Sequence, residues 1–159
     1  MPDHSQSRNM PPPALVTELI RTGQILPDQG WTVLLGGRTN QIWKVEDPRG
    51  ARVVKRYVRA AGTPLFRNDP PAELRVLAAL RATGLAPRAL CEAGTPADPV
   101  LVYVHQAGQV WREGPQRVAR TLKALHEQPV TKDLTDLPAA PDGSDALAQQ
   151  ALAMLADLP

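Results

Sequence analysis

The stretch "WTVLLGGRTNQIWKVEDPRGARVVKRYV" (residues 31–58) contains three short segments rich in β-branched and aromatic residues. These segments are "WTVLL", "QIWKVE" and "RVVKRYV", and the turn-forming segments "GGRTN" and "DPRG" separate them. Alternating apolar and polar residues, bounded by glycine, proline and asparagine, are typical of consecutive β-strands. We therefore expect a three-stranded antiparallel meander over residues 31–58.

The next segments predict one helix and two further strands. In "PPAELRVLAALRATG" (residues 70–84), Asp69 can cap a helix, Pro70 suits its first position and Gly84 can end it. The segments "PRALCEA" (87–93) and "VLVYVHQ" (100–106) then read as strands around the turn "GTPADP" (94–99). The predicted fold class is α+β: a five-stranded antiparallel sheet in the order β-β-β-α-β-β, with one inserted helix.

Helical patterns also flank this sheet. Residues 14–22 predict a short amphipathic helix with Leu15, Leu19 and Ile20 on its apolar face. After the sheet, residues 114–129 and 143–159 show apolar stripes at helical spacing, and we expect a loop at 130–142 between them. The chain thus divides into an N-terminal extension (1–30), a sheet domain (31–106) and a helical segment (107–159).

Composition limits the class of protein. The 159 residues, 43% of them hydrophobic, suffice for one ordinary domain. No apolar run approaches the roughly 20 residues of a membrane helix, and the first residues lack the apolar core of a secretory signal, so we expect a cytoplasmic protein without membrane contact. Cys91 is the single cysteine and the three histidines are scattered, so we expect no structural metal.

The charge is unevenly distributed along the chain. Residues 1–130 carry 17 Lys and Arg against 11 Asp and Glu, a net charge of +6, whereas residues 131–159 carry 1 against 5, a net charge of −4. A basic body attracts phosphate, either in a small ligand or in a nucleic acid backbone. Charge alone therefore leaves both an enzyme and a nucleic-acid-binding protein open.

A lysine and a glutamate form the first candidate site. In "RVVKRYV", alternation places Lys55 on one face with Val53 and Tyr57, and a buried ammonium there requires a carboxylate or a phosphate. Glu73, in the first turn of the predicted helix, is directed toward the same interior and is the expected partner of Lys55. The alternatives are a solvated edge strand for Lys55 and a carboxylate favoured by the helix dipole for Glu73.

Two backbone segments are further candidates. In "GGRTN", glycines let backbone N–H groups approach a phosphate and two side chains can add donors, although a plain hairpin turn is the alternative. In "VLVYVHQAGQVW", the strand end can offer backbone hydrogen bonds to a purine edge, or it is an ordinary buried strand. We read the side chains of His105 and His126 as structural or exposed, because neither has a visible catalytic partner. The candidate positions in these two segments are Gly36, Gly37, Arg38, Thr39, Asn40, Tyr103, Val104 and His105.

Taken in order, these segments resemble the aminoglycoside phosphotransferase and choline kinase family, which has a protein-kinase-like fold. The resemblance spans roughly residue 31 to the end. It rests on "LLGGRTNQIWKV", "VVKRY", "PPAELRVLAALRATGLAPRAL", "VLVYVHQAGQVW" and "VARTLKALHEQP". It implies that residues 31–106 form a kinase-like N-lobe and that residues 107–159 form the hinge exit with the first helices of a C-lobe.

The resemblance also implies roles for the candidate residues. Residues 36–40 would face the phosphates of ATP, Lys55 would contact phosphate oxygens and Glu73 would orient Lys55. The backbone of residues 103–105 would bind adenine. The parent reaction would transfer a phosphoryl group from ATP, with Mg²⁺, to a small-molecule alcohol such as choline, thiamine or an aminoglycoside.

The sequence departs from the family pattern after the helices. Nothing in it resembles the "HGDxxxxN" catalytic loop or the metal-binding aspartate that follows in the family. His126 is followed by Glu127 and Gln128, and there is no later histidine. We therefore expect a chain truncated before the catalytic loop, with no catalytic or metal-binding residue of its own and no activity alone.

Two alternatives stay open. One is a non-catalytic kinase-like module that binds a protein or nucleic acid, although the acidic tail and the missing aromatic-basic alternation count against nucleic acid. The other is a partly folded relic with exposed stripes around Leu122 and Leu152.

Overall fold

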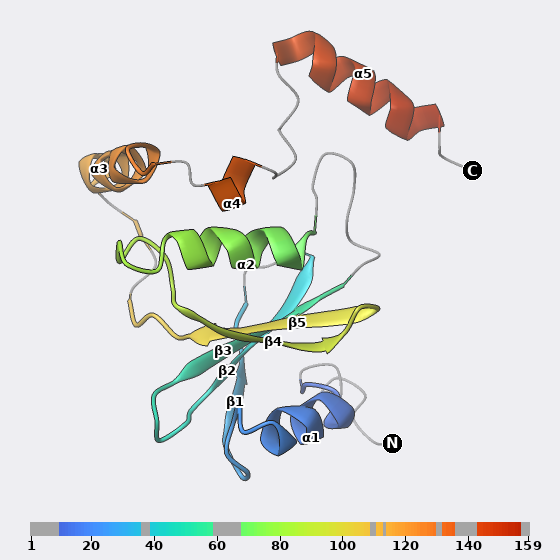
Figure 1. Cartoon of the computed structure of the whole chain (residues 1–159), viewed down its shortest axis with the longest axis vertical. Helices are drawn as coiled ribbons and strands as arrows, with labels where there is room; N and C mark the ends of the chain where they lie inside the picture. Colours follow the sequence, from blue (N-terminus) through green and yellow to red (C-terminus); the bar gives the residue numbers. More distant parts are fainter. Residues whose placement is uncertain are drawn as a thin grey trace.

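The computed structural model describes residues 10–35, 39–58, 68–108, 111–112, 114–129, 132–135 and 143–156 (Figure 1). Helices and strands follow one another along the chain much as the sequence predicts. Their bounds are α1 Pro13–Arg21, β1 Trp31–Val33, β2 Asn40–Val45, β3 Arg52–Tyr57, α2 Pro70–Ala79, β4 Ala89–Thr95, β5 Asp98–Val104, α3 Pro115–His126, α4 Lys132–Thr135 and α5 Gly143–Ala156.

The five strands form one antiparallel sheet in the spatial order β1-β2-β3-β5-β4. The meander β1-β2-β3 is confirmed, with Trp31 opposite Val45 and Ile42 opposite Lys55. The predicted order, with a helix between the third and fourth strands, is also confirmed. Because β3 lies between β2 and β5, the alternative of a solvated edge strand around Lys55 is wrong.

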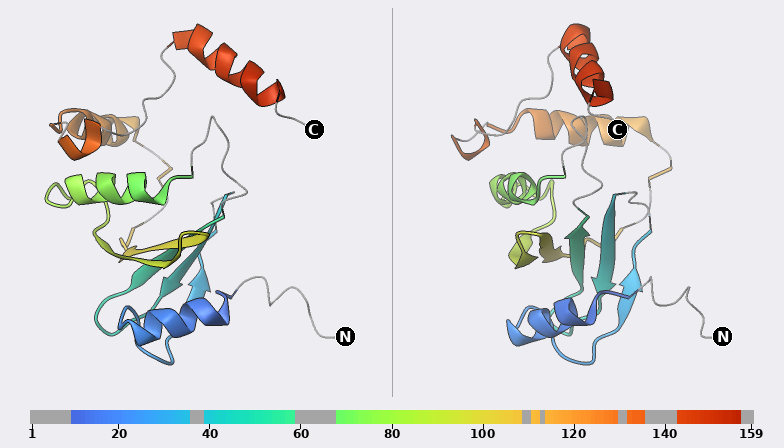
Figure 2. Two further views of the ribbon diagram at one scale, coloured as in Figure 1. Left: turned by 45° about the vertical axis from the view of Figure 1, so that its right-hand side comes forward. Right: turned by 90° about the vertical axis from the view of Figure 1, so that its right-hand side faces the viewer.

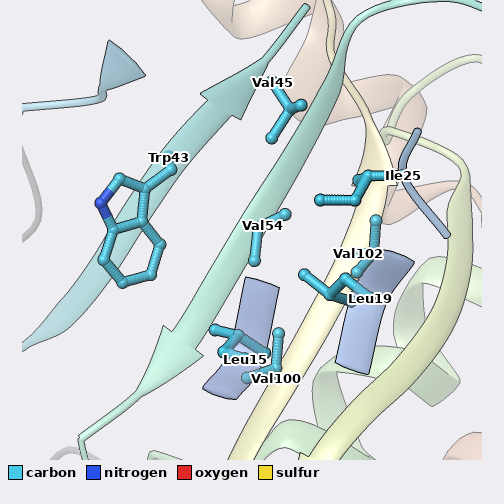
Figure 3. Packing of buried hydrophobic residues seen from close by; sticks show 8 residues of the cluster. All are labelled: Leu15, Leu19, Ile25, Trp43, Val45, Val54, Val100 and Val102. Atoms are coloured by element: carbon cyan, nitrogen blue, oxygen red, sulfur yellow. The ribbon is translucent and has the colours of Figure 1, made fainter. Parts of the chain in front are cut away.

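The main core lies between α1 and one face of the sheet. Leu15 and Leu19 of α1 pack against Trp43, Val54 and Val102, and all five are buried (Figure 3). Side chains alternate between the two faces of a strand, so residues 52, 54 and 56 of β3 face α1. Residues 53, 55 and 57 face the opposite side, where α2 lies (Figure 1).

Helix α2 begins as predicted and ends earlier. The side chain of Asp69 accepts a hydrogen bond of 3.0 Å from the backbone N–H of Ala72, and Pro70 occupies the first turn. The predicted end at Gly84 is wrong, because the helix ends at Ala79. Thr83 Oγ1 donates to the carbonyl of Leu80 at 2.7 Å, and this side-chain bond to the backbone competes with a further helical turn.

The C-terminal helices lie beyond α2, away from the sheet (Figure 2). The two predicted helices are present as α3 and α5, but the predicted loop at 130–142 contains the four-residue helix α4. Helix α4 contacts α2, and this tertiary contact supports a turn that local sequence does not indicate. Leucines on both longer helices are exposed, among them Leu122 and Leu152.

The hairpin of β4 and β5 depends on a glycine near the end of β4. Gly94 has φ +78°, and a Cβ atom there would overlap the backbone carbonyl oxygen of Asp98. We expect Gly94→Ala to lower the free energy of unfolding by about 2 kcal/mol in urea titrations, through strain and overlap together. Gly84→Ala is the matched control, because Gly84 has φ +71° and open space around it. It should cost about 1 kcal/mol from strain alone. Equal losses in both variants would show that the overlap relaxes freely.

Candidate functional site

Lys55 and Glu73 form an ion pair on the face of the sheet that α2 covers. Lys55 Nζ lies 2.5 Å from Glu73 Oε2, and the two side chains are 16% and 33% exposed. The predicted pairing is confirmed. The geometry follows from strand alternation at β3 and from the position of Glu73 in the first turn of α2, which the Asp69 cap fixes.

A tyrosine lies beneath the ammonium group. Lys55 Nζ is 4.6 Å from the centroid of the Tyr57 ring, close enough for a cation–π interaction. Burial, with the nearby Glu73 carboxylate as a second cause, holds the pKa of Tyr57 far above its usual range. Burial and then Glu73 likewise raise the pKa of Tyr103 to about 12. Both phenols therefore stay protonated at neutral pH, and Lys55 is the cation among them.

The predicted phosphate-facing turn is only partly described. Gly36, Gly37 and Arg38 lie outside the described residues, whereas Thr39 forms a bend that leads into β2. Asn40 and Asn68 exchange side-chain hydrogen bonds of 3.0 and 2.8 Å. The amide of Asn40 thus ties the start of β2 to the segment before α2, which gives this residue a structural role near Lys55.

The strand end predicted to bind a purine is integrated into the sheet. The N–H of Val104 donates to the carbonyl of Arg88 at 2.9 Å, and the N–H of His105 donates to that of Ala51 at 2.9 Å. These two N–H groups are therefore not available to adenine. Tyr103 lies opposite Val53 in the register, which places it on the same face as Lys55.

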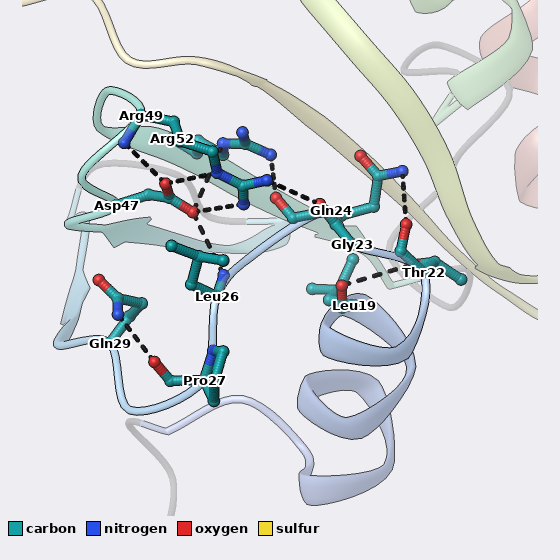
Figure 4. A network of polar contacts seen from close by, with 10 residues as sticks. All are labelled: Leu19, Thr22, Gly23, Gln24, Leu26, Pro27, Gln29, Asp47, Arg49 and Arg52. Carbon is teal, nitrogen blue, oxygen red and sulfur yellow. Dashed lines mark hydrogen bonds and ion pairs between the residues drawn. The ribbon is translucent and has the colours of Figure 1, made fainter.

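Sequence reasoning missed a buried carboxylate on the other side of the molecule. Asp47, fully buried at its side chain, accepts hydrogen bonds from Arg49 and, at 3.3 Å, from the N–H of Leu26 (Figure 4). Arg52 Nε is 3.9 Å from the same carboxylate. The Arg49 side chain, through its hydrogen bonds, is the main cause that holds the pKa of Asp47 well below its usual range. The "DPRG" motif predicts only the local turn, not the contact with the loop after α1.

The other basic side chains of β3 also have partners. Arg56 Nε lies 2.6 Å from Asp98 Oδ1, and Arg56 donates to Gln41 at 2.8 Å. Arg52 donates to the backbone carbonyl of Gln24 as well as facing Asp47. The positive charge of this strand is therefore largely neutralised within the fold, and it forms no open basic stripe along β3.

A groove of about 850 Å³ lies at the tip of the β4–β5 hairpin. It extends between the segment that starts α2 and Glu18 of α1, and prolines and carboxylates line it. Glu18, Asp69 and Glu92 give it an acidic character, while Lys55 and Glu73 are not among its lining residues. Phosphate would be repelled there, so this groove is separate from the candidate nucleotide site.

Comparison with known proteins leaves the family open, since no protein-family model and no curated protein matches the chain. Within the described ranges, no three His, Cys, Asp or Glu side chains gather closely enough to hold a metal ion. Across the same part of the chain, none of the helices has the length and apolarity needed to cross a membrane.

Proposed function

We propose that this chain binds ATP as the N-lobe of a small-molecule phosphotransferase similar to choline, thiamine or aminoglycoside kinases. The observation that carries the proposal is the ion pair between Lys55 on the third strand and Glu73 on the helix that follows. Phosphoryl transfer depends on positioning and charge stabilisation, and a lysine held by a carboxylate can present its ammonium group to phosphate oxygens.

The neighbourhood of Lys55 supports an anionic ligand. Its ammonium is mostly shielded from solvent, so a phosphate that reaches it interacts in a medium less polar than water. Two phenols close to Lys55 on this face, Tyr57 and Tyr103, stay neutral, and Glu73 is directed at the lysine rather than away from it. The Lys55 ammonium is thus the charged donor that a phosphate would engage when Lys55 moves away from Glu73.

Phosphoryl transfer itself requires groups that this sequence does not provide. The sequence has no "HGDxxxxN" motif, and the described residues offer no carboxylate cluster that fits Mg²⁺. The proposed activity is therefore nucleotide binding without transfer by this chain alone. The alternative of a nucleic-acid module is less well supported, because the arginines of β3 are paired with acids inside the fold.

A binding experiment with the purified chain tests the proposal. We expect ATP, with and without Mg²⁺, to raise the melting temperature and to give a measurable Kd by calorimetry. Lys55→Ala should weaken binding by about tenfold or more, because it removes a charged hydrogen-bond donor to phosphate. Arg56→Ala is the matched control: its side chain faces the opposite side of β3 and should leave the Kd unchanged.

Three results would contradict the proposal. The wild-type chain would show no response to ATP, Lys55→Ala would bind as tightly as wild type, or Arg56→Ala would be as damaging as Lys55→Ala. ATP turnover above the level of Lys55→Ala would overturn the narrower claim that this chain binds without transferring phosphate.

A further inference from the structure

Tyr57 is a buried residue beside the Lys55–Glu73 ion pair, and the proposed function assigns it no role. It is 2% exposed, it lies two residues after Lys55 on the same face of β3, and its ring supports the Lys55 ammonium at 4.6 Å. Its hydroxyl, however, has no hydrogen-bond partner within the described part of the chain. Buried polar groups are almost always paired in native proteins, so an unpaired hydroxyl at this place requires an explanation.

The Glu73 carboxylate is an acceptor close to this hydroxyl. Burial, and then Glu73 as an acceptor and as a negative charge, raise the pKa of Tyr57, so its hydroxyl is a donor at neutral pH. In the present structure, Glu73 receives its short ion pair from Lys55 instead. The carboxylate thus has two donors close to it: the Lys55 ammonium in a short ion pair, and the Tyr57 hydroxyl, which lies near it without a well-formed hydrogen bond.

We propose that Tyr57 is a positioning residue whose hydroxyl donates to Glu73 when Lys55 turns to an anionic ligand. Its ring holds the ammonium in the free state, and its hydroxyl replaces the ammonium at the carboxylate in the bound state. This inference deepens the proposed function and rests on it for the identity of the ligand, a nucleotide polyphosphate. The Glu73 side chain is only 33% exposed. Without this second donor, the negative charge of Glu73 would be poorly compensated when Lys55 moves away.

A double-mutant cycle without any ligand tests the exchange of donors. In the wild-type background, Tyr57→Phe removes an unpaired hydroxyl, so the urea midpoint should stay the same or rise. In a Lys55→Met background, which mimics a lysine that has left Glu73, the same change should lower the midpoint by about 0.5–1 M. A merely structural tyrosine would shift both backgrounds equally, and this result would overturn the proposal. Lys55→Leu serves as the background if Lys55→Met does not fold.

ATP binding provides the second readout. Tyr57→Phe should weaken ATP binding by about tenfold, and in a Glu73→Ala background, which lacks an acceptor for the hydroxyl, the further effect of Tyr57→Phe should disappear. Unchanged ATP affinity in Tyr57→Phe would overturn the role of Tyr57 in binding. If wild type fails to bind ATP, the proposed function fails, while the ligand-free cycle still decides whether Tyr57 and Lys55 exchange places at Glu73.

Discussion

Replacing Trp43 by alanine should lower the free energy of unfolding by about 3–5 kcal/mol. Trp43 is 2% exposed and belongs to the cluster that joins α1 to the sheet (Figure 3). Its removal leaves a large cavity between β2 and the residues around it, and a close-packed core fills such a cavity only in part. Urea unfolding followed by far-ultraviolet circular dichroism measures the loss.

Trp111→Ala is the matched control for this prediction. Trp111 is 57% exposed and lies after β5, so the same truncation should change stability by no more than about 0.5 kcal/mol. Similar losses in both variants would mean that the α1 side of the sheet is not the main core. The pair also tests the fold, because a chain that lacks a cooperative core would respond weakly to both substitutions.

The order of strands and the ion pair follow from local rules. Turn residues between β-branched segments predict the meander, and Asp69 followed by Pro70 predicts where α2 begins. Once these elements are placed, alternation on β3 and the first helical turn bring Lys55 and Glu73 to the same interior. The pairing could therefore be predicted from the sequence, because each half depends on a short segment.

Other features depend on contacts between distant segments. Asp47 accepts a hydrogen bond from the N–H of Leu26, and no pattern within either segment indicates this contact. The N–H of His105 is used by the carbonyl of Ala51, so a strand end that looks open in the sequence is closed by its neighbour. The sequence predicts only that Tyr57 shares a strand face with Lys55. Whether its hydroxyl has a hydrogen-bond partner depends on packing rather than on residue type.

The second large effect is expected at the buried carboxylate. Asp47→Asn should lower the free energy of unfolding at neutral pH by about 3 kcal/mol, because breaking a buried ion pair leaves one charge without its partner. That charge is Arg52, whose side chain is only 14% exposed. The hydrogen bonds from Arg49 to the carboxylate are weakened as well, although the Arg49 side chain is 42% exposed and can turn to water. Urea unfolding at neutral pH measures the effect.

The pH dependence of the difference between wild type and Asp47→Asn tests the cause. The folded-state pKa of Asp47 is lowered, chiefly by hydrogen bonds from Arg49, so its charge stabilises the fold fully above the unfolded pKa of about 3.9. That contribution decreases below the unfolded pKa and is lost as the pH falls through the folded pKa. The difference in free energy of unfolding between wild type and Asp47→Asn should therefore narrow progressively below about pH 4. Glu46→Gln, which removes an exposed carboxylate paired with Lys44, should differ little from wild type. A gap between wild type and Asp47→Asn that stays constant down to about pH 2 would assign the stabilisation to side-chain shape rather than to charge.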